Sequence, residues 1–342
     1  MAAGITRFAQ LQEFRDRLRD LPKGNAAVVR QAKERNARLT KPSGSLGRLE
    51  ELAVWYAAWR GHTWPDRIDP QILIFAGNHG VAKRGVSAFP PEVTRQMVAN
   101  FEVGGAAINQ LAVQAGARLD VCPIELDRPT GDITQGPAMS EAEFLAAIER
   151  GWNAVSRRTG LLVVGEMGIG NTTAASAICF ALYGGDADGW IGKGTGVTGD
   201  TLRTKQEAVA AAVALNGPFD RTAGLRALQH LGGREIAAMA GAIMRARCYE
   251  IPVILDGFVC SAAAAALQAE AGDALDHAIA GHRSDEAAHG RLLERLGKLP
   301  LLDLEMRLGE GSGAAAAILI LKCALACHSG MSTFDEAGVS RN

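Results

Sequence analysis

The sequence predicts an α/β fold, in which a parallel sheet carries helices on both faces. Short apolar runs typical of buried strands alternate along the chain with segments of helical character. Glycine-bearing loops follow several of these runs, and Gly accounts for 40 of the 342 residues. This length is sufficient for one large α/β domain or for two linked domains.

The first part of the chain is expected to be helical before the first strand begins. The helices are separated by Pro- and Gly-containing turns, and a linker with two prolines, at residues 63–70, precedes the strand. A loop at residues 81–91 follows the strand. The expected elements are helices at 8–21, 26–40 and 49–59, a strand at 71–75 and one long helix at 92–114.

The remainder alternates between strands and helices. Ser140 is a predicted N-cap, and Glu143 completes a capping box for the helix that follows. Two Ala-rich runs are expected to be helices packed closely on the sheet, and residues 332–342 a loose end. The expected elements are strands at 119–124, 161–164 and 251–255, and helices at 140–151, 174–182, 205–215, 261–267 and 314–321.

Four glycine-bearing loops are expected at the carboxyl ends of strands, where open α/β sheets bind their ligands. They surround Asn78, Glu166, Asp256 and Glu310. We therefore expect these loops to converge on one site.

The loop around Glu310 places a carboxylate between glycines just before an Ala-rich helix. Its sequence is Met306-Arg307-Leu308-Gly309-Glu310-Gly311-Ser312-Gly313. Glycine allows close approach of the backbone to a ligand, and a helix N-terminus offers free N–H groups. Glu310 is either a helix cap or a base that takes a proton from a bound ligand.

The loop around Glu166 has a similar pattern and follows an apolar strand. It reads Gly165-Glu166-Met167-Gly168-Ile169-Gly170-Asn171-Thr172-Thr173. A strand, a glycine turn and a helix are typical of phosphate binding in α/β proteins. The sequence is neither a P-loop, because no Gly-Lys-Ser/Thr follows, nor the dinucleotide fingerprint.

Composition narrows the class of protein. Lys and Arg number 36 and Asp and Glu 37, which gives a formal net charge of −1, and aromatic residues make up 5%. These values favour neither a nucleic acid nor an anionic membrane as partner. The N-terminus lacks an apolar signal region, and no uninterrupted apolar run reaches membrane-spanning length, so we expect a soluble cytoplasmic protein.

No metal or other cofactor is expected. The chain has six cysteines but no Cys-x-x-Cys pair and no His-x-x-x-His. Most cysteines lie in apolar runs, which favours buried thiols, and Cys323, Cys327 and His328 lack a closing ligand pair.

Three single residues allow alternative interpretations. His79 is either a base or a hydrogen-bonded loop histidine. Lys205 most simply belongs to a solvated helix face, and Asp256 is either part of the site or only an acceptor of hydrogen bonds from nearby loop N–H groups. The residues alone thus predict a cytoplasmic enzyme that holds a phosphorylated small molecule and uses loop carboxylates.

The motifs as a set resemble those of nicotinate-nucleotide–dimethylbenzimidazole phosphoribosyltransferases. They occur in family order from Lys41 to the C-terminus. The motifs are Lys41-Pro42-Ser43-Gly44-Ser45-Leu46-Gly47-Arg48-Leu49-Glu50, Gly77-Asn78-His79-Gly80-Val81, Gly85-Val86-Ser87, the loop at 165–173, Leu255-Asp256-Gly257-Phe258 and Arg307-Leu308-Gly309-Glu310-Gly311-Ser312-Gly313.

This resemblance implies transfer of phosphoribose from nicotinate mononucleotide to 5,6-dimethylbenzimidazole. The products are α-ribazole 5′-phosphate and nicotinate, with inversion at the anomeric carbon. The family further implies a homodimer, a Rossmann-like large domain at residues 66–320, and a small helical domain built from residues 1–65 and 321–342.

The resemblance also assigns roles. Glu310 is implied as the general base and Glu166 as a second active-site carboxylate. Many members have Asp where this chain has Asn78, so any role of charge there is open. The residues implied to bind phosphate and ribose are Gly168, Ile169, Gly170, Asn171, Thr172, Thr173, Lys205, Gly311, Ser312 and Gly313. Those implied to bind the base are Asn78, Phe89, Met97, Met167 and Leu308.

Two alternatives remain beside this function. A phosphoribosyltransferase with a diphosphate donor would normally use magnesium and an Asp-Asp pair, and the chain has no such pair. A non-catalytic nucleotide- or benzimidazole-binding protein would bind ligand without needing Glu310.

Overall fold

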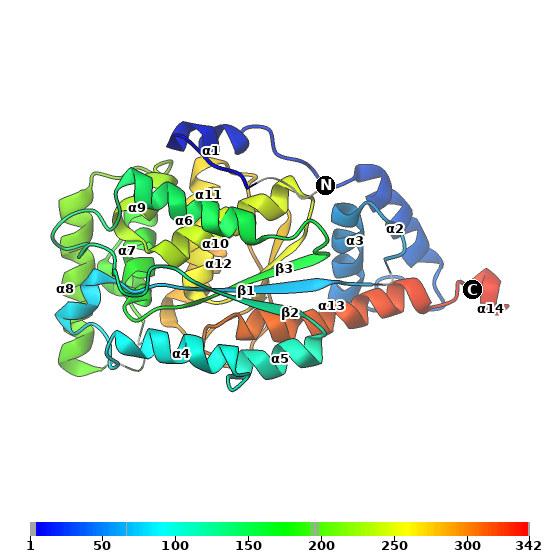
Figure 1. Ribbon diagram of the computed structural model, residues 1–342. Helices are drawn as coiled ribbons and strands as arrows, with labels where there is room; N and C mark the ends of the chain where they lie inside the picture. Colours follow the sequence, from blue (N-terminus) through cyan, green and yellow to red (C-terminus); the bar gives the residue numbers. More distant parts are fainter. Residues whose placement is uncertain (1–4, 66, 193, 195, 197, 341–342) are drawn as a thin grey trace.

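The computed structural model describes residues 5–65, 67–192, 194, 196 and 198–340, and a parallel six-stranded sheet forms its centre (Figure 1). The strand order is β2-β1-β3-β4-β5-β6, and every neighbouring pair is parallel. The predicted fold class is therefore confirmed. The strands are β1 (Pro70–Ala76), β2 (Arg118–Pro123), β3 (Leu161–Met167), β4 (Val253–Leu255), β5 (Ala278–His282) and β6 (Pro300–Leu302).

Helices cover both faces of the sheet, which explains why the central strands are continuously apolar. Alternate side chains of one strand enter different clusters: Leu73 and Phe75 of β1 join one core, whereas Ile72 and Ile74 join the other. The first core lies under α6 (Glu141–Ala154), α7 (Asn171–Tyr183), α10 (Arg234–Cys248) and α11 (Phe258–Glu270). The second lies under α3 (Arg48–Arg60), α5 (Ala107–Ala115) and α13 (Ser312–Gly330).

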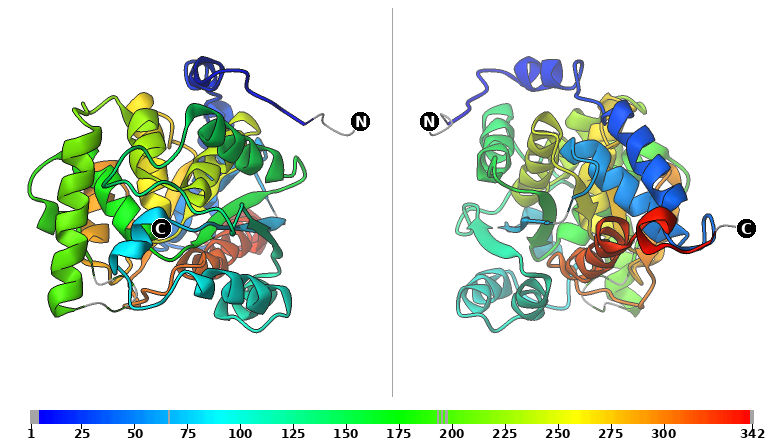
Figure 2. Two further views of the ribbon diagram at one scale, coloured as in Figure 1. Left: turned by 60° about the vertical axis from the view of Figure 1, so that its left-hand side comes forward. Right: turned by 90° about the vertical axis from the view of Figure 1, so that its right-hand side faces the viewer.

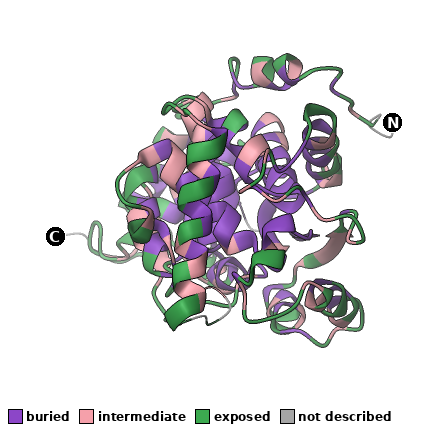
Figure 3. Ribbon diagram, turned by 90° about the vertical axis from the view of Figure 1, so that its left-hand side faces the viewer, coloured by how far each residue is buried: buried purple, intermediate pink, exposed green. Residues whose placement is uncertain are grey.

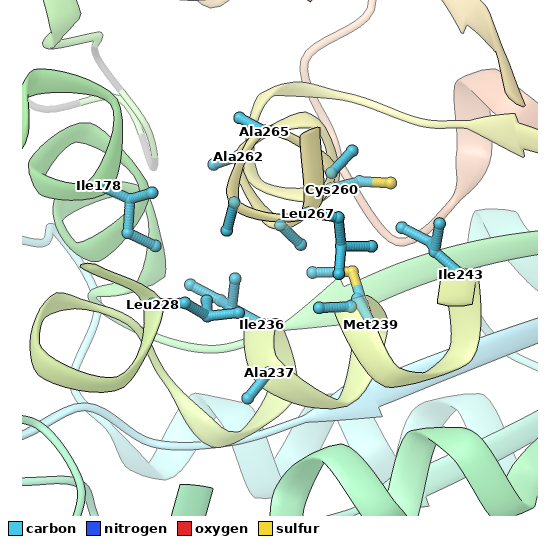
Figure 4. Packing of buried hydrophobic residues seen from close by; sticks show 14 of the residues in the cluster. Ile178, Leu228, Ile236, Ala237, Met239, Ile243, Cys260, Ala262, Ala265 and Leu267 are labelled. Atoms are coloured by element: carbon cyan, nitrogen blue, oxygen red, sulfur yellow. The ribbon is translucent and has the colours of Figure 1, made fainter. Parts of the chain in front are cut away.

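Small residues let the helices on the first face approach one another. A side chain at Gly151 of α6 would lie 1.7 Å from the carbonyl oxygen of Ala238 in α10. Figure 4 shows the other side of α10, where Met239 faces the Ala-rich helix α11. Helix α10 is consequently buried on nearly all sides, and the sequence analysis did not identify it.

An outer layer completes this face. It contains α8 (Gly199–Asn216), α9 (Gly224–Leu231) and α12 (Ala287–Leu296). Figure 3 shows α8 in front, with exposed residues on its outer side and buried residues toward the core. The sequence analysis missed α9 and α12, together with the short strands β5 and β6.

The predicted long helix at 92–114 is wrong. It is two helices, α4 (Glu92–Glu102) and α5, because the chain turns between them. Gly104 has a φ of +82°, which favours glycine, and a Cβ at Gly105 would lie 2.2 Å from the Asn100 side chain. The end expected to be loose also differs, since it forms a short helix, α14 (Phe334–Ala337).

An early and a late segment of the chain meet in a helical unit, visible in the right-hand view of Figure 2. Helix α2 (Ala26–Arg38) packs on α3, and Leu39 forms an isolated bridge with Thr333. Arg35 donates hydrogen bonds to the carbonyl oxygens of His328, Ser329 and Met331 at 2.8, 3.2 and 3.1 Å.

Helix α1 (Leu11–Arg17) lies apart from that unit, although it falls within the predicted helical segment 1–65. Phe8 and Phe14 pack edge-on against Trp152 of α6, at ring distances of 5.3 and 6.1 Å. In addition, α13 runs without a break through residue 320, where a domain boundary is predicted. The boundaries themselves stay a prediction.

Helix α13 is longer than the predicted run at 314–321. With 19 residues and a mean hydropathy of 1.5, it is long and apolar enough to cross a membrane by length and composition alone. Half of its apolar window is buried, and it packs against α3, α5 and β5. This packing is that of a core helix.

The crossing of α6 and α10 can be tested by Gly151→Ala. The new methyl group would meet backbone, which cannot rotate away, so we expect the free energy of unfolding to fall by roughly 2–3 kcal/mol. Urea denaturation measures the change. Gly136→Ala is the control, because a Cβ at Gly136 would meet no atom within 4 Å apart from its chain neighbours. Equal midpoints for the two variants would contradict the close crossing.

Candidate active site

A cavity of about 470 Å³ opens at the carboxyl ends of the strands, a volume within the range of small-molecule sites. The loops containing Glu166, Asp256 and Glu310 converge on it, as predicted. The Asn78 loop does not. The cavity lining includes Phe89, Val93, Met97, Glu166, Met167, Gly168, Ile169, Asn171, Thr172, Gly194, Asp256, Phe258, His282, Ser284, Glu286, Arg307, Leu308 and Glu310.

Glu310 is held in an unusual conformation at the edge of this cavity. Its φ is +61°, in the left-handed region that glycine favours. The turn is fixed by Asp256, which accepts hydrogen bonds from the N–H groups of Gly311 at 3.1 Å and Ala314 at 2.9 Å. A Cβ at Gly165 would lie 2.5 Å from the Gly311 nitrogen, so a glycine is required beneath the turn.

The Glu310 carboxyl faces the cavity without satisfying its hydrogen-bonding capacity. The residue is 5% exposed, and its Oε2 has no hydrogen-bond partner among the described residues. Burial, and secondarily the Asp256 carboxylate, raises the pKa of Glu310 to about 7. A carboxylate with this pKa can both accept and release a proton near neutral pH.

Glu166 lies at the end of β3 and also lines the cavity. The side-chain amide of Asn171 donates a hydrogen bond to its Oε2, and its Oε1 packs where a Cβ on Gly309 would lie. Burial raises the pKa of Glu166 well above its usual value, and the carboxylates of Glu235, Asp256 and Glu310 add to the effect. Glu166 and Glu310 therefore both bind protons more tightly than they would in water.

The glycine turn after β3 leads into α7. Gly170 has a φ of +96° and forms the N-cap of that helix. Ile169 donates its N–H to the Thr94 hydroxyl at 3.2 Å, which ties the turn to α4. Gly168, Ile169, Asn171 and Thr172 line the cavity, whereas Gly170 and Thr173 lie behind it.

Lys205 contradicts the simple interpretation of a solvated helix face. The residue is fully buried, and its Nζ donates to the Thr172 hydroxyl and to the Gly192 carbonyl, each at 2.9 Å. Burial lowers the pKa of Lys205 to about 8, while the Glu286 carboxylate acts in the opposite direction. The lysine thus supports the first turn of α7 from behind.

The Gly311–Gly313 turn supports the site without lining the cavity. The Gly311 N–H is occupied by Asp256, and both the N–H and the hydroxyl of Ser312 donate to the Gly309 carbonyl, at 3.0 and 2.7 Å. A Cβ on Gly313 would lie 2.2 Å from the His282 ring. Asp256 accepts N–H groups, as one alternative expected, both from this turn and from Gly257 in its own loop.

Asn78 lies outside the cavity lining. Its side-chain amide donates to the Leu126 carbonyl at 2.9 Å, and the residue is 7% exposed. His79, beside it, is a hydrogen-bonded histidine rather than a cavity base, because its Nε2 lies 2.6 Å from Glu235. The remaining base-pocket candidates, Phe89, Met97, Met167 and Leu308, form an apolar wall with Val93.

Several lining residues were missed by the sequence analysis, above all His282, Ser284, Glu286 and Arg307. His282 ends β5, and Ser284 and Glu286 follow it; this strand has only one large aliphatic residue, Ile279. The segment therefore resembled a polar surface stretch. The available signal for a functional loop was a strand that ends in Gly281-His282 and is followed by Ser284, Asp285 and Glu286.

The structure also places the six cysteines and His328, which was considered above with Cys323 and Cys327 as a metal ligand. Cys179 and Cys260 are buried, but Cys323 is exposed and the other three are partly exposed, so the expectation that most thiols are buried is wrong. Both ring nitrogens of His328 are engaged, with Asn36 at 2.8 Å and the Thr63 carbonyl at 2.9 Å.

The class of protein follows from a comparison with known families. The phosphoribosyltransferase family model DBI_PRT matches residues 21–339. A site at the carboxyl ends of parallel strands, with a glycine turn opening a helix, fits an enzyme that handles a phosphorylated sugar.

Individual relatives narrow this class. Nicotinate-nucleotide–dimethylbenzimidazole phosphoribosyltransferases of Ruegeria sp. (strain TM1040) and Ruegeria pomeroyi are 62% and 63% identical to the chain, each covering 96% of it and 97% of the relative. A crystal structure of the Thermus thermophilus enzyme of that name is 39% identical, with a TM-score of 0.85, and covers 93% of this chain and 100% of that one. The chain belongs to the nicotinate-nucleotide–dimethylbenzimidazole phosphoribosyltransferase family.

The raised pKa of Glu310 predicts a pH-dependent effect of Glu310→Gln on stability. Because the folded-state pKa lies above the usual 4.5, folding favours the protonated form, and this stabilisation is lost as pH rises through about 7. Between pH 5 and pH 8, the free energy of unfolding of the native chain should therefore fall by on the order of 2 kcal/mol relative to that of the variant. Unfolding free energies measured at both pH values test this; a constant difference would contradict the raised pKa.

Proposed function

We propose that this phosphoribosyltransferase acts on nicotinate mononucleotide and 5,6-dimethylbenzimidazole, producing α-ribazole 5′-phosphate and nicotinate. The names of the relatives support the substrates. The observation that carries the chemistry is the buried, unpartnered Glu310 carboxyl beside an apolar wall. An apolar aromatic base fits that wall, and the carboxyl supplies the single polar function the base requires.

The leaving group needs no acid in this reaction. Nicotinate departs from a positively charged pyridinium, so its nitrogen leaves with the bonding pair and becomes neutral. The incoming benzimidazole nitrogen attacks the anomeric carbon from the opposite face, which converts a β-linkage into an α-linkage. Inversion is thus part of the proposal.

The attacking base must lose a proton. When one ring nitrogen bonds to carbon, the ring becomes cationic and the N–H on its other nitrogen becomes acidic. We assign Glu310 as the general base that accepts this proton, since its pKa of about 7 matches neutral working conditions. Glu166 is assigned to the ribose side of the same cavity, where its carboxyl offers oxygen atoms to the developing charge.

The phosphate and ribose are assigned to the glycine turn and the first turn of α7. Gly168, Ile169, Asn171 and Thr172 line the cavity, and a helix N-terminus provides N–H groups for a phosphate. Lys205 is assigned to support Thr172 and to contribute positive charge. The supporting residues behind this surface are Gly170, Thr173, Gly311, Ser312 and Gly313.

The proposal includes a cytoplasmic homodimer. Phe89 and Leu308 at the cavity are 52% and 54% exposed, and exposed apolar side chains of this kind are a surface that a second copy can cover. Light scattering of the purified protein measures the oligomeric state. A monomeric mass at micromolar concentration would contradict the dimer.

The first experiment is a metal-free incubation of purified protein with both substrates, followed by chromatography. We expect nicotinate and α-ribazole phosphate in equal amounts. Nicotinate without the ribazole would indicate hydrolysis or another acceptor. Ligand binding without turnover would favour the non-catalytic alternative.

Glu310→Gln should reduce transfer by roughly 10²–10⁴-fold, because the variant cannot accept the benzimidazole proton. In the native enzyme kcat/KM should rise with pH through about 7, and the variant should lose this dependence. Glu305→Gln is a matched control: Glu305 lies in the same loop with a φ of +55°, is exposed and does not line the cavity. Near-native turnover of Glu310→Gln would remove this residue from the mechanism.

Met97→Ser tests the apolar wall. The polar, smaller side chain should raise KM for dimethylbenzimidazole roughly 10-fold and leave KM for nicotinate mononucleotide unchanged. Gln96→Ser, on the exposed face of α4, is the control. Equal changes in both KM values would place Met97 outside the base pocket.

A further inference from the structure

A buried pair of polar side chains lies directly beneath the glycine turn of the site. His79 follows β1, and Glu235 lies in the first turn of α10. The His79 Nε2 is 2.6 Å from Glu235 Oε1, and the two side chains are 1% and 0% exposed. The pair does not line the cavity and has no part in the proposed proton transfer.

Gly77 and Gly233 make room for this pair, and Gly168 and Gly170 of the turn pack against it. A Cβ at Gly77 would lie 2.5 Å from Glu235 Oε2, and one at Gly233 would lie 2.3 Å from the His79 ring. A Cβ on Gly168 would be 3.5 Å from both the His79 Nε2 and Glu235 Oε1, and one on Gly170 would be 3.2 Å from the His79 Cβ. The turn that lines the cavity thus rests on the imidazole and carboxylate themselves.

An apolar core would fill this space more simply. Burying ionisable groups is unfavourable unless their partners satisfy them, and here His79 Nδ1 and Glu235 Oε2 have no hydrogen-bond partner among the described residues. These features indicate a role for the pair beyond packing.

The carboxylate of Glu235 also acts on Glu166. Groups from several elements interact with Glu166: Glu235 from α10, Asp256 after β4, Glu310 before α13, Asn171 from α7 and the Cys260 thiol of α11. After burial itself, Glu235 is the largest cause of the raised pKa of Glu166. Glu235 thus contributes to the protonation of Glu166, a residue that lines the cavity.

We propose that His79 and Glu235 are positioning residues, whose hydrogen bond fixes the Gly168 turn and places a negative charge behind Glu166. This inference rests on the proposed function for its kinetic consequences. The hydrogen bond of the pair and its packing beneath the Gly168 turn do not depend on which substrates bind. Removing the charge while keeping a hydrogen-bond acceptor separates the two contributions.

The test compares Glu235→Gln and His79→Gln with the native protein. Infrared difference spectra follow the carbonyl stretch of protonated Glu166, identified by its absence in Glu166→Gln. Because the negative charge favours the protonated form, this band should disappear at lower pH in Glu235→Gln. In His79→Gln, which disturbs the turn, KM for nicotinate mononucleotide should rise about tenfold with a smaller change in kcat.

Matched controls distinguish a structural role. Glu270→Gln removes a carboxylate, 11% exposed, that bonds Leu225 and Arg15 away from the cavity. His277→Gln removes a buried, hydrogen-bonded histidine that does not line the cavity. Both should leave the Glu166 titration and the KM values unchanged.

An unchanged Glu166 titration in a folded Glu235→Gln variant would overturn the electrostatic role. An unchanged KM in a folded His79→Gln variant would overturn the positioning role. The infrared titration requires no turnover, so it decides the electrostatic role even if the proposed transfer reaction fails.

Discussion

The Asp256 carboxylate is the contact on which the site depends. It directly follows β4, and among the backbone N–H groups that it accepts, those of Gly311 and Ala314 lie more than fifty residues away along the chain. These bonds join the start of α13 to the sheet and hold Glu310 in its left-handed conformation. Gly165 permits the approach from below, because its Cα can lie against the turn. A helix, a strand end and a functional carboxyl are thereby fixed by one side chain.

Crowding of carboxyl groups gives the cavity its acid–base character. Glu166, Glu310 and Asp256 line one small space, and Glu235 lies behind it. Burial raises the pKa of each of these three carboxyls, and repulsion from neighbouring carboxylates further raises the pKa values of Glu166 and Glu310. His282, 3.5 Å from Asp256, and the backbone amides act in the opposite direction there. The same cluster therefore distributes protons unequally among chemically similar groups.

The sequence was sufficient for the fold class and for three of the four converging loops, because residues 72–75 of β1 and 161–164 of β3 are apolar and glycine turns are local. Most of the apolar wall was implied only by the family resemblance. It was insufficient where burial depends on distant segments. Lys205 reads as a surface residue until the Gly192 segment covers it, and the residues of the His79–Glu235 pair are 156 positions apart. Helix α10 contains charged residues at both ends but is buried between α6 and α11. The Gly104-Gly105 break, by contrast, was visible and was overlooked.

The joining of the chain ends has a consequence for folding during synthesis. Arg35 in α2 reaches carbonyl groups 293 to 296 residues later, and Leu39 pairs with Thr333. Helices α2 and α3 therefore emerge from the ribosome long before the α13 surface against which they pack. Contacts of such sequence separation form late and slowly. The surfaces of α2 and α3 that pack on the late segment therefore stay exposed until α13 has been made.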